Sequence, residues 1–262
     1  SAPKALNNPS RALCLQAISR GLWLNREQNI LVIYNLFTEE LSNQILNNKN
    51  RIILGENSEL HTIEYTINRS KNKFINNTYE NILINKNSKL KTISIQSNKS
   101  NGYFHKFSKN KLKSDSTYSN FIFSSGLRFN KQDLEFDLEG ENSVCNIQSA
   151  AFLNENDHQE VKTRVNHLYP NCKSYQKVKN VLNDNSKGVY QGKIFVKDVA
   201  QKTDAYQLSK AVLLNERSEF NSKPELEIYA DDVKCSHGST SGSLDKDSIY
   251  YLMTRGLSRK DS

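Results

Sequence analysis

Four side chains that can bind a metal ion or transfer a proton lie within seven residues near the C-terminal end of the sequence: Asp231, Asp232, Cys235 and His237. Residues 226–230, directly before them, alternate apolar and polar side chains, a pattern typical of a strand. If the chain stays extended, Cys235 and His237 point to the same side, because alternate residues of a strand share a face. A thiolate and an imidazole placed in this way can share a metal ion or a proton.

Each of these residues also has a structural interpretation. His237 can form a hydrogen bond with Asp231 or Asp232 within a turn, and Cys235 can be a small buried residue rather than a ligand. Adjacent residues of a strand face opposite ways, so Asp231 and Asp232 are poor joint ligands and are better interpreted as turn or cap residues. Both interpretations stay open at this point.

The cysteines are too dispersed for a framework of disulfides. Cys14, Cys145, Cys172 and Cys235 include no CxxC pair, so neither a disulfide scaffold nor a self-contained zinc site is expected. Reduced thiols fit a cytosolic protein. Cys172 follows His167 by five residues, a spacing that defines no metal geometry, and we interpret it as structural.

Composition and charge indicate a soluble protein without nucleic acid as a partner. The chain has 262 residues, enough for a sizeable core, with 36% hydrophobic residues and a formal net charge of +8. The lysines are scattered among Asn and Ser rather than gathered with Arg and aromatic residues, which indicates a solvated basic surface. No apolar run is long enough to cross a bilayer, and the opening residues SAPK do not resemble a signal peptide, so we expect no membrane association.

The order of predicted elements favours a mainly β protein. Residues 1–50 contain a predicted amphipathic helix at 10–24, a strand at 30–37 and a helix at 38–46. Short strands divided by polar turns follow, at 51–54, 60–67, 81–84, 90–95, 120–123, 134–138 and 144–153. Such strands without alternating helices leave a sandwich, a barrel or a β-solenoid, whose turns stack along one axis.

Several polar or glycine-containing segments are given structural roles. Residues 68–77 and 97–116 are rich in Asn, Lys and Ser and are predicted to be exposed loops. Gly188 and Gly192 are predicted to bracket a turn. Residues 201–204 are predicted to form an inward polar row that stacks as a hydrogen-bonded ladder.

A family resemblance is carried by four segments of the second half of the chain: HLYPNCKS at 167–174, GVYQGKIFV at 188–196, AQKTDAYQ at 200–207 and KPELEIYADDVKCSHG at 223–238. Two more segments support them, LEFDLEGE at 134–141 and IYYLMTRGL at 249–257. Together they resemble the SufB/SufD family of iron-sulfur cluster assembly proteins. The CSHG segment at 235–238 is similar to the SufD branch of that family, and the similarity is strong from 126 to 257.

The resemblance implies a fold and a domain organisation. The core of the family is a right-handed parallel β-helix with flanking N- and C-terminal helical segments. On this basis, residues 1–50 form an N-terminal helical and strand region, and 51–243 form the β-helix core. Residues 244–262 begin a C-terminal helical region that is longer in the family.

The resemblance also implies a function in a complex. The chain would be a non-catalytic scaffold subunit that assembles and delivers iron-sulfur clusters together with a SufB-like subunit and a SufC-like ATPase. The sequence contains no GxxxxGKS/T phosphate-binding loop, as expected if ATPase activity belongs to the SufC partner. No cofactor is expected to bind tightly to the isolated chain. A cluster would reside transiently at the SufB/SufD contact, and the chain would form a homodimer in the absence of SufB.

Roles for individual residues follow from the same resemblance. His237 and Cys235 are the candidates for cluster assembly and for any metal ligation, with His237 preferred. His237, Asp231 and Asp232 would face SufB. The candidates for docking on SufC are Leu244, Ile249, Tyr250 and Leu252.

Two other classes of protein remain as alternatives. A β-solenoid enzyme acting on carbohydrate would present acidic catalytic residues along one groove, and the sequence offers no such spaced set. A purely structural, self-associating protein would need no reactive residues. The resemblance implies the bacterial cytoplasm as the location, with a plastid as the alternative.

Overall fold

The alternation of buried and exposed side chains along each strand determines the architecture. The computed structural model describes residues 30–243 and 246–258. In the strand Lys173–Leu182, for example, Gln176, Val178 and Asn180 are buried, while the lysines between them are exposed. A strand of this kind covers a core with one face and meets solvent with the other.

Fifteen strands and one helix lie in the described residues. The strands are β1 (Ile30–Phe37), β2 (Ile45–Leu54), β3 (Glu59–Asn68), β4 (Ile75–Ile84), β5 (Lys89–Gln96), β6 (Ser100–Leu112), β7 (Thr117–Ser125), β8 (Leu127–Leu138), β9 (Val144–Leu153), β10 (His158–His167), β11 (Lys173–Leu182), β12 (Lys187–Val196), β13 (Thr203–Leu213), β14 (Glu219–Ile228) and β15 (Val233–Ser243). The helix α2 (Lys246–Thr254) follows them.

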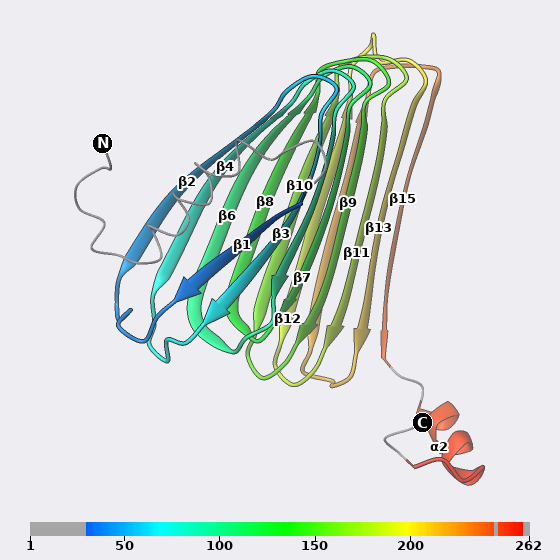
Figure 1. Cartoon of the computed structure of the whole chain (residues 1–262). Coiled ribbons are helices and arrows are strands. Elements are labelled where there is room, and N and C mark those ends of the chain that lie inside the picture. The colour runs from blue at the N-terminus through cyan, green and yellow to red at the C-terminus, as the bar shows by residue number, and fades with distance from the viewer. Residues whose placement is uncertain (1–29, 244–245, 259–262) are drawn as a thin grey trace.

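The strands form two parallel sheets. The odd-numbered strands make an eight-stranded sheet and the even-numbered strands a seven-stranded sheet, each in sequence order. Val144 pairs with Lys173 and Lys173 with Asp204, so these two turns contain 29 and 31 residues. The chain is therefore a β-solenoid of about seven turns, with α2 lying beyond the end of β15 (Figure 1). The predicted mainly β, parallel solenoid is confirmed.

One corner of the solenoid accounts for part of the asparagine content. Between each of the first six even-numbered strands and the next odd-numbered strand, one residue has a positive φ: Asn57, Asn87, Asp115, Asn142, Asn171 and Lys202. Asn and Asp tolerate this left-handed conformation better than other non-glycine residues. Their backbone N–H groups donate to carbonyl oxygens of the next turn, as Asn87 does to Ser114 at 3.0 Å. The turns are thus locked together at the corner as well as along the strands.

The residue after each left-handed position is small and lines the inside of the same corner. These residues are Ser58, Ser88, Ser116, Ser143, Cys172 and Thr203. Their hydroxyl groups bond corner carbonyls, as the Ser116 Oγ does to the Lys113 oxygen at 2.5 Å. Cys172 occupies one place in this column: its Sγ lies 3.2 Å from Ser143 Oγ and 3.3 Å from the Gly140 oxygen. The structural interpretation of Cys172 is confirmed.

The interior between the sheets is partly polar. Thr163 of β10 donates to Gln176 Oε1 of β11 at 2.5 Å, and the Tyr190 hydroxyl of β12 lies 3.1 Å from Gln207 Oε1 of β13. These bonds join the two sheets across the core. They satisfy polar groups that would otherwise destabilise the buried interior.

Two predictions of secondary structure are wrong. Residues 38–44 form the first corner, with Asn43 at positive φ, and β2 begins at Ile45, so there is no helix at 38–46. Most of the predicted loop at 97–116 is β6, which points Phe104, Lys106 and Ser108 inward. The solenoid accepts polar residues on its inner face, and for that reason a polar composition did not indicate a loop here.

Two predictions about polar and glycine positions are also wrong. Residues 201–204 span a corner and not an inward row: Gln201 is half-buried there, and the Thr203 hydroxyl donates to the Ala200 oxygen at 2.8 Å. Gly188 and Gly192 bracket no turn, because both lie inside β12 and face the core. Other parts of the chain provide the interior polar groups.

The remaining predictions concern the N-terminal region and membrane-spanning helices. The predicted strand at 30–37 is confirmed as β1. β1 and β2 pair with β3 and β4, so the described sheets begin at Ile30. The predicted helix at 10–24 lies outside the described residues. Among the described helices, none is long and apolar enough to span a membrane.

Gly192→Ala is expected to lower the free energy of unfolding by about 2 kcal/mol, because a Cβ there would overlap the Tyr190 side chain and Gln207 Oε1. Gly242→Ala is the matched control, since a Cβ at Gly242 in β15 meets no atom within 4 Å. Urea denaturation of both variants measures the difference. Equal stability of the two variants would contradict the packing described for β12.

Candidate functional site

No further turn of the described chain covers the last turn of the solenoid. β15 pairs with β13 alone, and β14 pairs with β12 alone. One edge of each strand therefore carries backbone N–H and C=O groups that face no neighbouring strand of the described chain. Exposed edges of this kind are ready to pair with another chain.

Cys235 and His237 lie on the inner face of this last turn. In the register, Cys235 pairs with Ala205 and His237 pairs with Gln207, and both of those partners are buried on the inner face of β13. The two side chains share one side of β15, as expected from their spacing. Cys235 is half-buried against an apolar cluster that includes Ile194, whereas His237 is exposed at the open end.

The environment of Cys235 keeps its thiol protonated. Burial raises the pKa of Cys235, the nearby Asp204 carboxylate raises it further, and a hydrogen bond with the Ala205 backbone opposes the change only in part. A thiolate is the form that ligates iron or attacks sulfur. In the isolated chain, Cys235 is therefore poorly prepared for either reaction, and His237 is the more accessible group.

Asp231 and Asp232 occupy the exposed turn that leads into β15. The Lys202 N–H donates to the Asp232 carbonyl at 2.6 Å, and the Asp232 N–H donates to Gln201 Oε1 at 2.9 Å. Within the described ranges, no hydrogen bond joins His237 to either aspartate, and the turn is held by the Lys202 backbone and the Gln201 side chain. The two carboxylates flank the open end and face solvent.

His167 and Cys172 are not brought together as ligands. His167 Nε2 lies 2.9 Å from Ser174 Oγ in the core, whereas Cys172 belongs to the corner column. Burial lowers the pKa of His167 to about 4, although the charge of Asp204 opposes the change. In the part of the chain that the structure describes, no cluster of three or more His, Cys, Asp or Glu side chains could hold a metal ion.

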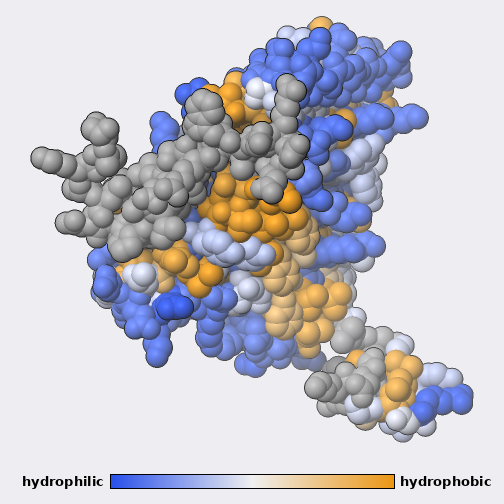
Figure 2. Space-filling model, viewed as in Figure 1, coloured by the Kyte–Doolittle hydropathy of each residue, from blue (hydrophilic) through white to orange (hydrophobic). Residues whose placement is uncertain are grey.

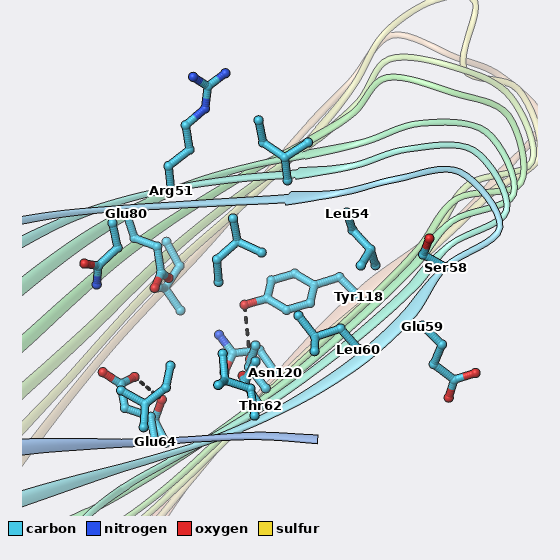
Figure 3. Close-up of a pocket in the computed structure, with 18 of the residues that line it drawn as sticks. Arg51, Leu54, Ser58, Glu59, Leu60, Thr62, Glu64, Glu80, Tyr118 and Asn120 are labelled. Atoms are coloured by element: carbon cyan, nitrogen blue, oxygen red, sulfur yellow. Dashed lines mark hydrogen bonds between the residues drawn. The ribbon is translucent and has the colours of Figure 1, made fainter. Parts of the chain in front are cut away.

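A buried ion network at the opposite end of the solenoid has no counterpart among the sequence predictions. The Lys106 Nζ lies 3.0 Å from Glu80 Oε2 and 3.7 Å from Glu64 Oε2. Glu64 also accepts hydrogen bonds from Asn35 at 2.6 Å and from Ser94 at 3.1 Å. These groups line a cavity of about 740 Å³ inside the first turns. Figure 3 shows the Tyr118 ring crossing this cavity between the carboxylates and the corner of Ser58.

The charges in this network stabilise one another. Burial disfavours the charged form of Glu64, but the Lys106 ammonium and hydrogen bonds outweigh it and lower the pKa of that carboxyl. Burial likewise disfavours the charged form of Lys106, and the two carboxylates more than compensate and raise its pKa. A period of two in residues 104–112 would have been the signal for inward placement of Lys106, but the polar composition concealed it.

The residues proposed from the sequence for docking on a partner are in or next to α2. Tyr250 is 69% exposed, whereas Ile249 and Leu252 are half-buried. Leu244 lies outside the described residues. Tyr251 and Met253 are also exposed, so much apolar surface of this short helix meets solvent.

A family model and two similar proteins point to the same family. The family model described as "SUF system FeS cluster assembly, SufBD core domain" matches residues 36–262. The chain is 36% identical over 160 residues to the iron-sulfur cluster assembly protein SufD of Escherichia coli. The aligned residues cover 60% of this chain and 38% of that protein. It is 29% identical over 165 residues to SufD of Plasmodium falciparum, covering 61% of this chain and 11% of that protein.

A plant protein is similar over a shorter stretch. The chain is 42% identical over 77 residues to the chloroplastic protein ABCI7 of Arabidopsis thaliana, covering 29% of this chain and 16% of that protein. In each of these three comparisons, the chain spans well under half of the relative's length.

Lys106→Met is expected to lower the free energy of unfolding by about 3 kcal/mol, because Glu64 and Glu80 would lose their buried counter-charge. Lys109→Met is the control: Lys109 faces solvent and lies 3.9 Å from Glu135, so its loss should change stability by less than about 1 kcal/mol. Urea denaturation measures both. A Lys106→Met protein as stable as the control would contradict the assigned network.

The stability of the protein should depend on His167 in acid. The folded chain takes up this proton only near pH 4, whereas the unfolded chain takes it up near 6.5. Stability is therefore lost as the pH falls between these values, by about 3 kcal/mol in total. We expect His167→Gln to reduce this loss, and His61→Gln, at a partly exposed position, to retain it. Unfolding free energies at neutral and acid pH test this, and an unchanged loss in His167→Gln would refute the assignment.

Proposed function

The chain belongs to the SufBD core family of the SUF system for iron-sulfur cluster assembly, as its sequence resemblance predicted, and on that premise we propose that it acts as a scaffold subunit of a SufBCD-type complex. In this role it performs no catalysis of its own. It helps to build iron-sulfur clusters and to deliver them. The observation that carries the proposal is the open last turn, where Cys235 and His237 share the inner face next to unpaired strand edges.

A SufB-like subunit is the proposed partner at this end. The free edges of β14 and β15 offer backbone donors and acceptors along ten and eleven residues. A second solenoid that adds strands there would cover the inner face and remove His237 from solvent. Asp231 and Asp232 would lie at the rim of that contact. In the absence of a SufB-like subunit, we expect a second copy of this chain to pair with the same edges and form a homodimer.

The cluster is the cargo of the proposed contact, held transiently and not as a resident cofactor. His237 has an exposed imidazole that can ligate iron or transfer a proton to a sulfur intermediate. Cys235 would contribute only if the partner lowered its pKa, for example by placing a positive charge near the thiol. His237 is therefore the primary residue and Cys235 the secondary one.

A SufC-like ATPase is the proposed partner of the helical segment. α2 presents Tyr250 to solvent, and Ile249 and Leu252 are close enough in the helix to complete an apolar docking face. Leu244, before the helix, would extend this face. ATP hydrolysis by that partner would alter the contact at the solenoid end and expose the assembly site. For the location, relatives from a bacterium and a chloroplast support the bacterial cytoplasm or a plastid.

His237→Ala is expected to slow anaerobic cluster formation by the reconstituted three-subunit complex about tenfold or more, since a ligand or proton-transfer group is lost. Ser236→Ala is the matched control, because Ser236 is the exposed neighbour on the opposite face of β15. Cluster formation is followed by its visible absorbance, and co-elution of the subunits checks assembly. If both variants assemble clusters at the same rate, His237 has no part in the mechanism.

A further inference from the structure

The two outer faces of the solenoid differ in whether their lysines have a carboxylate within ion-pair distance. On the even-numbered sheet, several outward lysines are paired with a carboxylate of the neighbouring strand, although the exposed Lys162 of β10 forms no such pair. Lys131 lies 3.3 Å from Glu160, Lys187 lies 3.1 Å from Glu219, and Lys193 lies 2.5 Å from Glu227. Much of the lysine charge on this face is thus neutralised within the fold.

The odd-numbered sheet carries unpaired lysines on its last three strands. Lys173, Lys177 and Lys179 project outward from β11, Lys210 from β13 and Lys234 from β15, and all five are exposed. In the described residues, no carboxylate lies within ion-pair distance of any of them. Figure 2 shows hydrophilic side chains projecting over these strands and hydrophobic ones gathered over the first strands of the same sheet. We call the surface formed by these five lysines the lysine face.

Acidic residues are almost absent from the lysine face. Asp204 is the outward carboxylate of β11, β13 and β15, and it accepts a hydrogen bond from the Tyr175 hydroxyl at 2.7 Å. The lysine next to it in the register on each side, Lys173 or Lys234, forms no ion pair with it. The positive charge therefore extends across all three strands.

The register makes this arrangement unfavourable for the isolated fold. Lys179 and Lys210 are direct neighbours on adjacent parallel strands. Neighbouring strands are about 4.8 Å apart, and like charges that face each other across strands destabilise a sheet. On the even-numbered sheet, by contrast, Lys131 has the acidic residue Glu160 as its direct neighbour on the adjacent strand. Folding alone gives no reason for a second lysine, which indicates that the counter-charge is external.

A hollow at the edge of the lysine face suits a carboxylate. It has a volume of about 380 Å³ and is lined by Asn142, Val144, Asn171, Lys173 and Lys202. Asn142 Nδ2 already donates to Asp115 Oδ1 at 2.9 Å, whereas the side chains of Lys173, Lys202 and Asn171 can bind an acidic side chain here. Lys234 links the face to the open turn, because it precedes Cys235 in β15.

We propose that the lysine face, together with Lys202, is a docking surface for a protein partner that presents a cluster of Asp and Glu side chains. The face has no outward Arg, the residue that recognises phosphate in a bidentate manner, and Asp204 in its middle would repel a phosphate backbone. A protein surface can place a donor against Asp204 and carboxylates against the lysines. The proposal concerns an outer face and stands whether or not the chain handles a cluster.

The test compares two variants with the same change in charge. Lys177→Gln/Lys179→Gln/Lys210→Gln removes three charges from the lysine face. Lys131→Gln/Lys187→Gln/Lys193→Gln removes three from the even-numbered sheet. The probe is a fluorescent poly-L-glutamate of about twenty residues at physiological ionic strength, with a single-stranded RNA of equal length in parallel. We expect the first variant to weaken peptide binding about tenfold and the second to change it less than about twofold.

Two outcomes of this comparison would overturn the proposal. Equal loss in both variants would mean that net charge alone attracts the peptide. Tighter binding of RNA than of peptide, lost in the first variant, would assign the face to nucleic acid instead.

A second measurement tests the physical argument without any probe. Lys210→Glu should raise the melting temperature, because Lys179 gains a counter-charge on the neighbouring strand, and it should also weaken peptide binding. A variant that melts at or below the wild-type temperature would contradict the claim that the fold tolerates this lysine pair only at a loss of stability.

Discussion

Parallel pairing of each strand with the strand one turn later is the interaction on which the rest of the structure depends. It places every residue next to its counterpart about 30 positions away, as Val144, Lys173 and Asp204 illustrate. Side chains at equivalent positions therefore form columns along the solenoid. A column must be compatible with itself: apolar residues stack, small hydroxyl residues fill a corner, and amides bond to amides. Charges must alternate in sign or find an external partner, as on the lysine face.

The same constraint explains why the interior can be polar. Where Gln176, Tyr190 and Gln207 meet, the Tyr190 hydroxyl lies within hydrogen-bond distance of the side-chain oxygen of each glutamine on the facing sheet. The ion network of Glu64, Glu80 and Lys106 is the extreme case, in which two carboxylates stabilise one ammonium beside a cavity. Such groups do not need to be catalytic to be retained, because removing one partner leaves the others buried without compensation.

The constraint also places chemistry at an end of the solenoid. In the middle turns, the inward-facing cysteines and histidine are enclosed: Cys145 is fully buried, His167 stays neutral in the core, and Cys172 belongs to a corner column. Only where stacking stops are inward-facing side chains accessible to another molecule. Cys235 and His237 are in that position. The last turn therefore offers both reactive side chains and free strand edges to a second subunit.

Features that depend on neighbours in the chain can be predicted from the sequence, whereas the surroundings of each side chain come from the folded structure. A short β-branched run predicts β1, and alternating patterns predict parts of several later strands. The spacing of Cys235 and His237 places them on one side of a strand, because these properties depend on neighbours in the chain. The polar composition of residues 97–116 predicts a loop and conceals the inward position of Lys106, because the inner face of this solenoid accepts polar residues whose partners lie on other turns. The pairing between strands one turn apart decides whether Cys235 is covered, whether His237 meets solvent and which lysines lack a neighbouring acid. Pairing between turns is a long-range property, and only the folded chain specifies it.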